Sequence, residues 1–385
     1  MNLRILAAWL LAATLPAAFA QECPPGDAFD KARGVVRDLQ RIDTPDGIQE
    51  TYGASIGGIT QWISVRGEDR ANPVLLFVHG GPASPAMPSH WQFQRAIEEY
   101  FTVVHYDQRG AGKTFRATGP ARRDQTLAIE TFVDDAIEVA EHVRQRLGKD
   151  KLVLVGHSWG TVVAMKAALK RPDLFHAYVG MGQVINTRTN EELSFQYGLE
   201  QARKEGNQAA IAEMEAIAPY PGDQPITRER IIIARKWPQH YGGLNAYRDA
   251  EQDYYYGASL LSPEYDCQDR KAFFDGSVYT LGKVLDEFLR VDLSGVREFP
   301  VPVVMFLGRH DYTTPSGPTA AWLGKVRAPY KRAVWFENAA HMIPWEEPGR
   351  TLLSLVGIVR PLATEEAGVD PVRSPQPGPP APDDL

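Results

Sequence analysis

A serine at the centre of Gly156–Gly160 (Gly-His-Ser-Trp-Gly) stands where a nucleophile would be expected. The apolar, partly β-branched run Lys151–Val155 before it predicts a buried strand, and the small-residue pattern Thr161–Leu169 after it predicts a helix. Strand, Gly-x-Ser-x-Gly and helix in this order are typical of a nucleophile elbow, a tight strained turn that exposes the serine above a sheet. The glycines would stand where a Cβ would collide with neighbouring backbone. The pattern therefore predicts Ser158 as a nucleophile.

Serine is a weak nucleophile unless a histidine takes its proton and an acid orients that histidine. After a nucleophile elbow the order along the chain is serine, acid, histidine. Asp311 follows a predicted strand over Val301–Leu307 and is the only acid in its loop, and His341 follows a predicted strand over Ala333–Phe336. We therefore expect Ser158, Asp311 and His341 to form a catalytic triad.

Two other histidines compete for the role of base. His310 precedes the acid, and His157 stands beside the nucleophile on the strained turn, from which its side chain would point elsewhere. A lone aspartate in a turn, or a lone histidine, is most often structural. Three such residues in the required order, each after its own strand, favour the triad over these alternatives.

Acyl transfer also needs two N–H donors placed to stabilise an oxyanion. One is expected from the backbone of Trp159, the residue after the nucleophile, and the other from the Gly/Pro-rich loop His79–Pro85. Pro82 has no N–H, so Gly81 is the best candidate in that loop. The alternative reading of the loop is a plain turn.

The elements that position these residues alternate between strand and helix. Strands are predicted over Gln49–Ile56, Gly58–Val65, Pro73–His79, Phe101–Tyr106 and Ala177–Met181, and helices over Trp91–Glu99, Ile129–Leu147, Ser316–Val326 and Gly349–Val359. The loop after Phe101–Tyr106 holds Asp107 and Arg109, which we expect to bond to each other or to loop backbone as structural supports.

The alternation stops at Val184 and resumes near Arg290. Between them the chain is rich in charge and aromatic residues, with helical patterns over Glu191–Lys204, Gln208–Ile217, Arg228–Trp237 and Tyr279–Leu289. Such an interruption predicts one α/β domain with an inserted helical lid. The expected division is a signal peptide over 1–20, the first part of the core over 21–183, the lid over 184–290, the second part of the core over 291–363 and a disordered Pro-rich tail over 364–385.

The N-terminus has the pattern of a processing signal. Arg4 is followed by the apolar run Ile5–Leu15 and an Ala-x-Ala-like site ending at Ala20, which predicts cleavage there, secretion and a periplasmic location. The run is short for a membrane-spanning helix. Two cysteines remain, Cys23 and Cys267, and in an oxidising compartment they would form a disulfide or stay as unrelated thiols.

A net charge of −7 argues against nucleic acid as a partner and against an anionic membrane surface. No segment after the N-terminal run is apolar and long enough to span a bilayer, so stable membrane insertion is not expected. The oligomeric state is left open by the sequence.

At these residues the chain resembles the α/β-hydrolase fold, a mostly parallel central sheet with helices on both faces, and within it the proline iminopeptidase family. The shared motifs are His79–Pro82, Asp107–Gly112, Gly156–Gly160, Gly308–Asp311 and Ala340–His341. The resemblance implies a serine hydrolase without metal or cofactor that releases N-terminal proline from peptides. The chain departs from the family pattern at His157 and Ala83, where family members usually have glycine.

Enzymes of that family hold the free amine of the substrate with lid carboxylates. The lid acids here are Glu191, Glu192, Glu200, Asp249, Glu251 and Asp253, with Glu191 and Glu192 as the first candidates for substrate binding. Tyr254 and Tyr255 are further candidates, because the aromatic residues Tyr254–Tyr256, Trp237 and Tyr241 could line a pocket. The alternatives are a solvated acidic face and aromatic packing of the lid onto the core.

Three functions remain open at this point. The leading one is a secreted aminopeptidase or amidase acting on short peptides, the second a carboxylesterase acting on small acyl esters, and the third a non-catalytic ligand-binding protein with a hydrolase-like shell. Ser158 at the elbow argues against epoxide hydrolase and dehalogenase chemistry, which use a carboxylate nucleophile in this fold.

Overall fold

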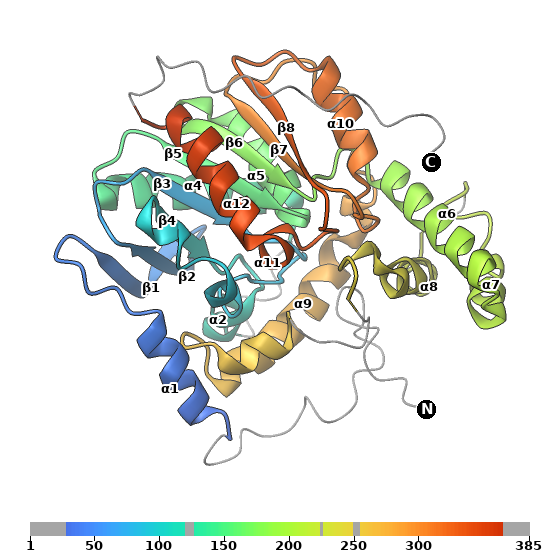
Figure 1. The fold of residues 1–385 in the computed structure, drawn as a ribbon, viewed down its shortest axis with the longest axis horizontal. Coiled ribbons are helices and arrows are strands. Elements are labelled where there is room, and N and C mark those ends of the chain that lie inside the picture. Colours follow the sequence, from blue (N-terminus) through green and yellow to red (C-terminus); the bar gives the residue numbers. More distant parts are fainter. Residues whose placement is uncertain (1–27, 120–126, 224–225, 249–254, 365–385) are drawn as a thin grey trace.

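The computed structural model of the chain describes residues 28–119, 127–223, 226–248 and 255–364. Within these residues the strands form one eight-stranded sheet in the order β1-β2-β4-β3-β5-β6-β7-β8 (Figure 1). The strands are β1 (Ile48–Ile56), β2 (Ile59–Gly67), β3 (Val74–Val78), β4 (Thr102–Tyr106), β5 (Leu152–His157), β6 (Phe175–Met181), β7 (Val303–Gly308) and β8 (Lys331–Phe336). β2 runs antiparallel to both neighbours, and β3 to β8 are parallel. The mostly parallel sheet expected from the sequence is confirmed.

Alternate side chains of each central strand enter two separate cores. In β3, Leu76 joins a cluster with α4 and α5, while Leu75 and Phe77 join a cluster on the opposite face. Successive residues of a strand point to opposite faces, so a continuous apolar run is what a strand covered on both sides requires. The apolar strands of this sequence therefore predict helices on both faces, as observed.

The helices are α1 (Asp30–Leu39), α2 (Gly112–Ala117), α4 (Ile129–Leu147), α5 (Trp159–Lys170), α6 (Thr187–Glu205), α7 (Gln208–Glu215), α8 (Arg228–Pro238), α9 (Cys267–Phe288), α10 (Ser316–Lys325), α11 (Ile343–Glu346) and α12 (Pro348–Ser354). α4, α5 and α10 cover one face of the sheet, and α11 and α12 cover the other, where they lie in front of the strands in Figure 1. Within the described residues, no helix is long and apolar enough to cross a bilayer.

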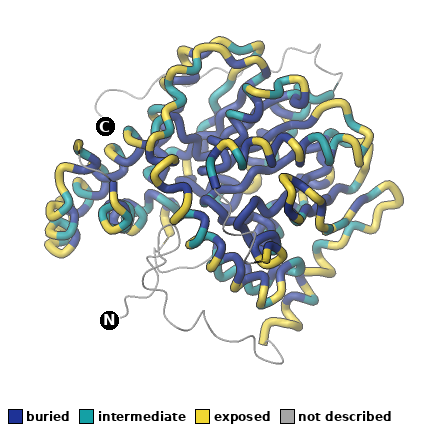
Figure 2. The backbone as a smooth tube through the Cα atoms, turned by 180° about the vertical axis from the view of Figure 1, so that it is seen from behind, coloured by how far each residue is buried: buried dark blue, intermediate teal, exposed yellow. Residues whose placement is uncertain are grey.

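Helices α6, α7 and α8 follow β6 and extend from the side of the body (Figure 1). They have a small core of their own, in which Phe195, Met214 and Trp237 are buried together with Leu285 and Leu289 at the end of α9. Figure 2 shows this extension as partly exposed turns beside the continuous buried interior of the sheet. α9 itself packs along α2 of the body, so the inserted segment is anchored to the core at its end.

The helix expected over Trp91–Glu99 is wrong. Two short 3₁₀ turns, His90–Gln92 and Ile97–Glu99, replace it. Gln94 donates to Glu98 at 2.8 Å, and Glu98 accepts from Arg66 at 2.6 Å in the interior. These buried polar contacts decide the local backbone, and the helical spacing of apolar residues does not reveal them. Helix α1 was not expected from the sequence.

The expected signal peptide (residues 1–20) and Cys23 lie outside the described residues, as does the tail beyond Thr364. The cleavage, the Cys23–Cys267 pairing and the disordered tail therefore stay predictions. Cys267 is the first residue of α9.

Asp107 and Arg109 do not bond to each other, contrary to one of the two expectations above. Arg109 makes a bidentate ion pair with Asp135 of α4, with both N–O distances 2.9 Å, and also donates to the carbonyl of Gly57. Gln61 donates to the same carboxylate at 2.7 Å. The interior pair thus ties the loop after β4 to the β1–β2 turn and to α4.

Replacing Asp135 by alanine should lower the free energy of unfolding by about 3–5 kcal/mol, because the buried Arg109 guanidinium would lose its counter-charge. Urea unfolding followed by circular dichroism measures this loss. Asp173→Ala, which breaks an exposed ion pair with Arg171, is the matched control and should leave the midpoint nearly unchanged. Equal midpoints for the two variants would contradict the structural role of the interior pair.

Candidate active site

Ser158 lies on a strained turn between β5 and α5. Its φ of +55° and ψ of −126° place a non-glycine residue at positive φ, which is rare and costs free energy. The flanking glycines are required by crowding. A Cβ at Gly156 would lie 2.8 Å from the carbonyl oxygen of Gly160, and a Cβ at Gly160 would lie 2.1 Å from that of Val78. The turn can therefore form only with glycine at both positions.

The turn is held by the backbone groups of Ser158 itself. Its N–H donates to the carbonyl of Met181 at the end of β6 (3.0 Å), and its carbonyl accepts from the N–H and the hydroxyl of Thr161 (2.8 and 2.6 Å). The residue is only 5% exposed. A hydroxyl at this position lies largely away from bulk solvent, which strengthens electrostatic interactions with it.

Asp311, just after β7, is surrounded by hydrogen-bond donors. Its carboxylate accepts from the N–H groups of Thr313 and Thr314 (2.9 and 2.8 Å) and from the Thr314 hydroxyl (3.0 Å). Its Oδ2 atom lies 2.9 Å from Nδ1 of His341. Because an ionised carboxylate only accepts, Nδ1 of His341 carries the hydrogen, and in the neutral ring Nε2 keeps a basic lone pair. The arrangement suits a general base oriented by an acid.

The ring of His341 packs on Gly182, which follows Met181. A Cβ there would lie 2.6 Å from Cε1 of His341, and Gly182 has a φ of +57°. The carbonyl of Met181 accepts from the N–H of Ser158. These contacts therefore bring the base loop, which follows β8 and carries His341, to the nucleophile elbow. Residues from β5, β6, β7 and β8 thus meet at the carboxyl edge of the sheet, where α/β folds place their sites.

The two competing histidines have other contacts. His157 Nε2 lies 3.1 Å from the backbone carbonyl of His341, so it carries the hydrogen and donates. Burial, together with the neighbouring His341, lowers the pKa of His157 to about 3, so its ring is neutral and its proton is used in this hydrogen bond. His310 instead contacts the hydroxyl of Tyr247 at 2.8 Å.

Of the two expected oxyanion donors, Trp159 directly follows Ser158, and Gly81 belongs to a loop that approaches Ser158 through Gly80. Trp159 is the first residue of α5, where backbone N–H groups have no intrahelical acceptor. Gly80 of the facing loop is so close that a Cβ on it would lie 2.9 Å from Cβ of Ser158. Gly81, with a φ of +120°, turns the chain there, and a Cβ on it would lie 2.5 Å from the nitrogens of Ala83 and Ser84. This geometry suits a loop whose backbone N–H groups would donate to the oxyanion of a substrate.

Gln108 was missed in the sequence reasoning, although it stands in the motif Asp107–Gly112. Its Nε2 donates to the carbonyl of His79 at 2.7 Å, and its Oε1 accepts from the indole N–H of Trp159 at 3.1 Å. Its backbone N–H also donates to Nε2 of His79, so His79 Nδ1–H donates to Gly80 (2.9 Å). Gln108 thus joins the two chain segments that carry the candidate oxyanion donors. The available signal was an amide side chain directly after a buried strand.

Asp107 is buried and accepts from the hydroxyl of Tyr265 and the N–H of Lys113. Burial raises the pKa of Asp107 to about 7, and these donors oppose that increase. The contacts tie the loop after β4 to the segment that precedes α9. Asp107 therefore supports the site from outside, as the sequence reasoning assigned it.

The lid candidates are placed differently from one another. Glu191 is buried among lid residues, where its oxygens accept from Arg235 (2.9 Å from Nε) and from the Tyr220 hydroxyl (2.6 Å). Glu192 and Glu200 are exposed on α6. Tyr254 and the acids Asp249, Glu251 and Asp253 lie outside the described residues.

The described aromatic candidates pack against other rings. Tyr255 is buried with its ring centroid 5.0 Å from that of Trp345, at a right-angled orientation, and beside Tyr256. Burial raises the pKa of Tyr255. Trp237 donates to Glu213 within the lid. These contacts place both rings in packing between elements.

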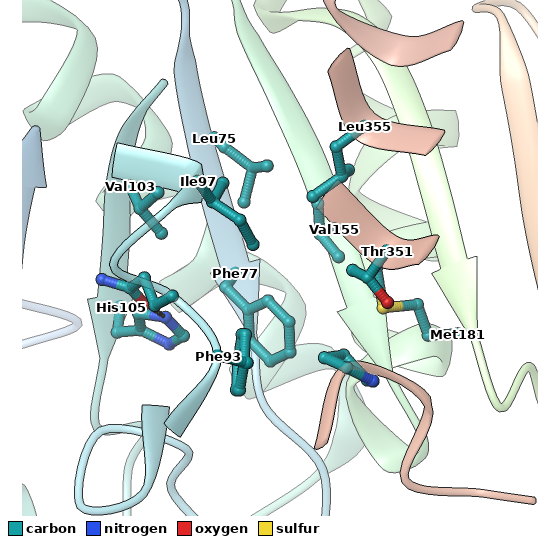
Figure 3. A pocket seen from close by; sticks show the side chains of 12 residues that line it. Leu75, Phe77, Phe93, Ile97, Val103, His105, Val155, Met181, Thr351 and Leu355 are labelled. Atoms are coloured by element: carbon teal, nitrogen blue, oxygen red, sulfur yellow. Dashed lines mark hydrogen bonds between the residues drawn. The ribbon is translucent and has the colours of Figure 1, made fainter. Parts of the chain in front are cut away.

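A cavity of about 20 Å³ lies between β3, β4, β5 and α12 (Figure 3). Phe77, Phe93 and Leu355 are among its apolar lining residues, and Met181 reaches it from β6. This volume has room for about one water molecule, so it holds no organic substrate. Another hollow, of about 540 Å³, opens between the start of α6 and the end of α9 and is lined by residues such as Arg188 and Asp292. None of the three triad candidates lines either of these two spaces.

Within the described residues, no group of three or more His, Cys, Asp or Glu side chains is arranged to hold a metal ion. Ser158, Asp311 and His341 can by themselves perform a nucleophilic attack with proton transfer.

A family model described as alpha/beta hydrolase fold matches residues 73–348. A protein of Bacillus subtilis named probable aminopeptidase YbaC is 32% identical over 296 residues, which cover 76% of this chain and 91% of that protein. The proline iminopeptidase of Saccharolobus solfataricus is 24% identical over 334 residues, covering 81% and 91%. Among solved structures, the proline iminopeptidase of Mycobacterium smegmatis superposes with a TM-score of 0.61 at 17% identity, over 82% of this chain and 99% of that one.

Gln108→Met should lower kcat about tenfold to a hundredfold with little change in KM, because the loop and the elbow lose the side chain that joins them, while the candidate substrate-binding residues are unchanged. Steady-state hydrolysis well below the unfolding temperature measures the effect. Gln92→Met removes a more exposed amide contact to Ser89 and is the matched control. An unchanged kcat in Gln108→Met would contradict the bridging role.

Proposed function

Since the chain belongs to the α/β-hydrolase family and is a hydrolase, we propose that it is a serine hydrolase of the aminopeptidase type, which releases N-terminal residues, proline first among them, from short peptides. The observation that carries the serine mechanism is the Asp311–His341 hydrogen bond beside the elbow of Ser158. The peptide substrate is supported by the names of the relatives that the chain matches over most of their length.

In the proposed reaction, Ser158 Oγ attacks the carbonyl carbon of the N-terminal residue while His341 Nε2 takes the hydroxyl proton. Asp311 stabilises the imidazolium that forms and stays ionised. The carbonyl oxygen becomes an oxyanion that accepts from the N–H groups of Trp159 and Gly81. His341 then gives its proton to the leaving amine, and the C–N bond breaks to leave an acyl-enzyme. Water, deprotonated by the same histidine, attacks the acyl carbon. The bond from that carbon to Ser158 Oγ breaks, His341 returns the proton to Oγ, and the free amino acid leaves.

A carboxylesterase is the second candidate, since the same residues would cleave an ester of a small acyl group. The contacts of Glu191 favour it, because both oxygens of this first amine-binding candidate already accept hydrogen bonds within the lid. An aminopeptidase would then hold the substrate amine with another lid acid. The remaining candidates are Glu192, Glu200, Asp249, Glu251 and Asp253.

The deciding measurement compares kcat/KM for a prolyl arylamide and a matched small acyl ester, with Ser158→Ala as the blank. The expected result is a preference for the prolyl amide, and a loss of several orders of magnitude in Ser158→Ala for both substrates. One of the five remaining acid-to-amide variants should then raise KM for the amide alone. Cleavage of the ester without the amide would replace the aminopeptidase proposal by the esterase.

We also propose that the protein is secreted through the signal-like residues 1–20 and works in the periplasm. The support is the sequence pattern alone, because these residues lie outside those that the structure describes. N-terminal sequencing of protein recovered from the periplasmic fraction should begin at Gln21. A mature chain that still begins at residue 1 would rule out the proposed cleavage.

A further inference from the structure

The backbone around His341 is held on every side by defined partners. The N–H of His341 donates to the carbonyl of Leu244 at 3.1 Å, and its carbonyl accepts from His157. The two neighbouring N–H groups, of Ala340 and Met342, both donate to Oε2 of Glu346 at 3.0 Å. One carboxylate oxygen therefore binds the residues immediately before and after the candidate base.

The other oxygen of Glu346 reaches a different part of the chain. Its Oε1 atom accepts from the N–H of Ala246 at 2.6 Å. Ala246 and Leu244 belong to the short segment 243–246, which follows α8 in the insertion between β6 and β7. Glu346 thus joins the base loop to an inserted segment that is distant in sequence.

The same segment also forms hydrogen bonds with the loop after β7, which carries Asp311. The carbonyl of Gly243 accepts from the N–H groups of Tyr312 and Thr313 (3.0 and 3.1 Å) and from the Thr313 hydroxyl (3.1 Å). A Cβ at Gly243 would lie 2.8 Å from Cβ of Tyr312, so the approach is as close as glycine allows. Tyr197 of α6 stacks on Tyr312 with ring centroids 3.6 Å apart. The inserted segment therefore contacts the residues next to both Asp311 and His341.

We propose that Glu346 is a positioning residue that fixes His341 against the segment 243–246, so that docking of the inserted segment determines the geometry of the base. The inference rests on the triad of the proposed function and is independent of the substrate. It gives the insertion between β6 and β7 a part in assembling the proposed catalytic groups.

The chemistry of the side chain fits this role. All three partners are N–H donors, and an ionised carboxylate can accept from each without presenting a hydrogen of its own. Burial raises the pKa of Glu346 to about 7, the nearby charge of Asp311 adds to the increase, and the three N–H groups oppose it. At about pH 8.5 the group is ionised and all three hydrogen bonds are complete. A glutamine of the same shape would turn an NH₂ group toward at least one donor.

Glu346→Gln, measured at about pH 8.5, should lower kcat about tenfold or more with KM within about twofold of the wild type, because the base loses its orientation while the candidate substrate-binding residues are unchanged. The rate of labelling of Ser158 by a fluorophosphonate should fall by the same factor. The far-downfield proton resonance of His341 Nδ1–H should broaden or shift, which a loss of stability alone would not cause below the unfolding temperature.

Glu347→Gln is the matched control. Glu347 also accepts a backbone N–H in this loop, from Asn338 at 3.0 Å, whereas the N–H groups of Ala340 and Met342 donate to Glu346 instead. Its kcat, labelling rate and resonance should match the wild type. If Glu346→Gln behaves like this control, the positioning role is overturned.

Gly243→Ala tests the same coupling from the inserted segment, and it keeps the inference testable if Glu346→Gln folds poorly. Gly243→Ala should lower kcat and the labelling rate with a small change in KM. The double variant Glu346→Gln/Gly243→Ala should lower kcat by less than the product of the two single fold-losses, since both changes disturb the same contact. Variants that lower only the unfolding temperature, with the labelling rate intact, would overturn the inference.

The labelling assay separates this inference from the proposed substrate. A wild-type protein that reacts with fluorophosphonate but cleaves no prolyl amide would refute the aminopeptidase proposal and leave the positioning test unaffected. A wild-type protein that does not react would refute the triad and, with it, the role of Glu346.

Discussion

The close approach of α5 to the end of β3 is the constraint on which the rest of the site depends. A single Cβ at Gly160 would lie 2.1 Å from the carbonyl oxygen of Val78 and 2.5 Å from that of His79, so any side chain there would push the helix away. The contact places the first N–H groups of α5 beside the His79–Gly81 loop, and Ser158, directly before α5, has a positive φ of +55°. Separating the two segments would leave the candidate nucleophile without the backbone donors that an oxyanion would require.

Side chains that take no part in the proposed chemistry satisfy the buried backbone around this contact. Gln108 accepts and donates between the loop and the elbow, His157 donates to the carbonyl of His341, and Glu346 accepts from three N–H groups. Buried N–H and C=O groups must be paired, because an unpaired one costs free energy. At this sheet edge, these hydrogen bonds join the backbone next to the candidate base to the loops around the candidate nucleophile.

The insertion between β6 and β7 enters the same network through main-chain atoms. The carbonyls of Gly243 and Leu244 accept from the loops that carry Asp311 and His341. Every residue has a main-chain carbonyl, whatever its side chain is. The acidic and aromatic composition of the lid therefore does not indicate these contacts. Glu191, the first acid considered for an amine, instead pairs with Arg235 inside the lid.

The sequence by itself determined the architecture and the order of the candidate catalytic residues. Ile129–Leu147 matches α4 residue for residue, and the strands lie within about two residues of their expected bounds, because apolar periodicity and glycine placement are local properties of the chain. The tertiary structure decided what depends on distant partners. Gln108, Glu346 and the pairing of Arg109 with Asp135 have no periodic signature. Their roles arise only when strands and an inserted segment, far apart in sequence, bring their backbone groups to one sheet edge.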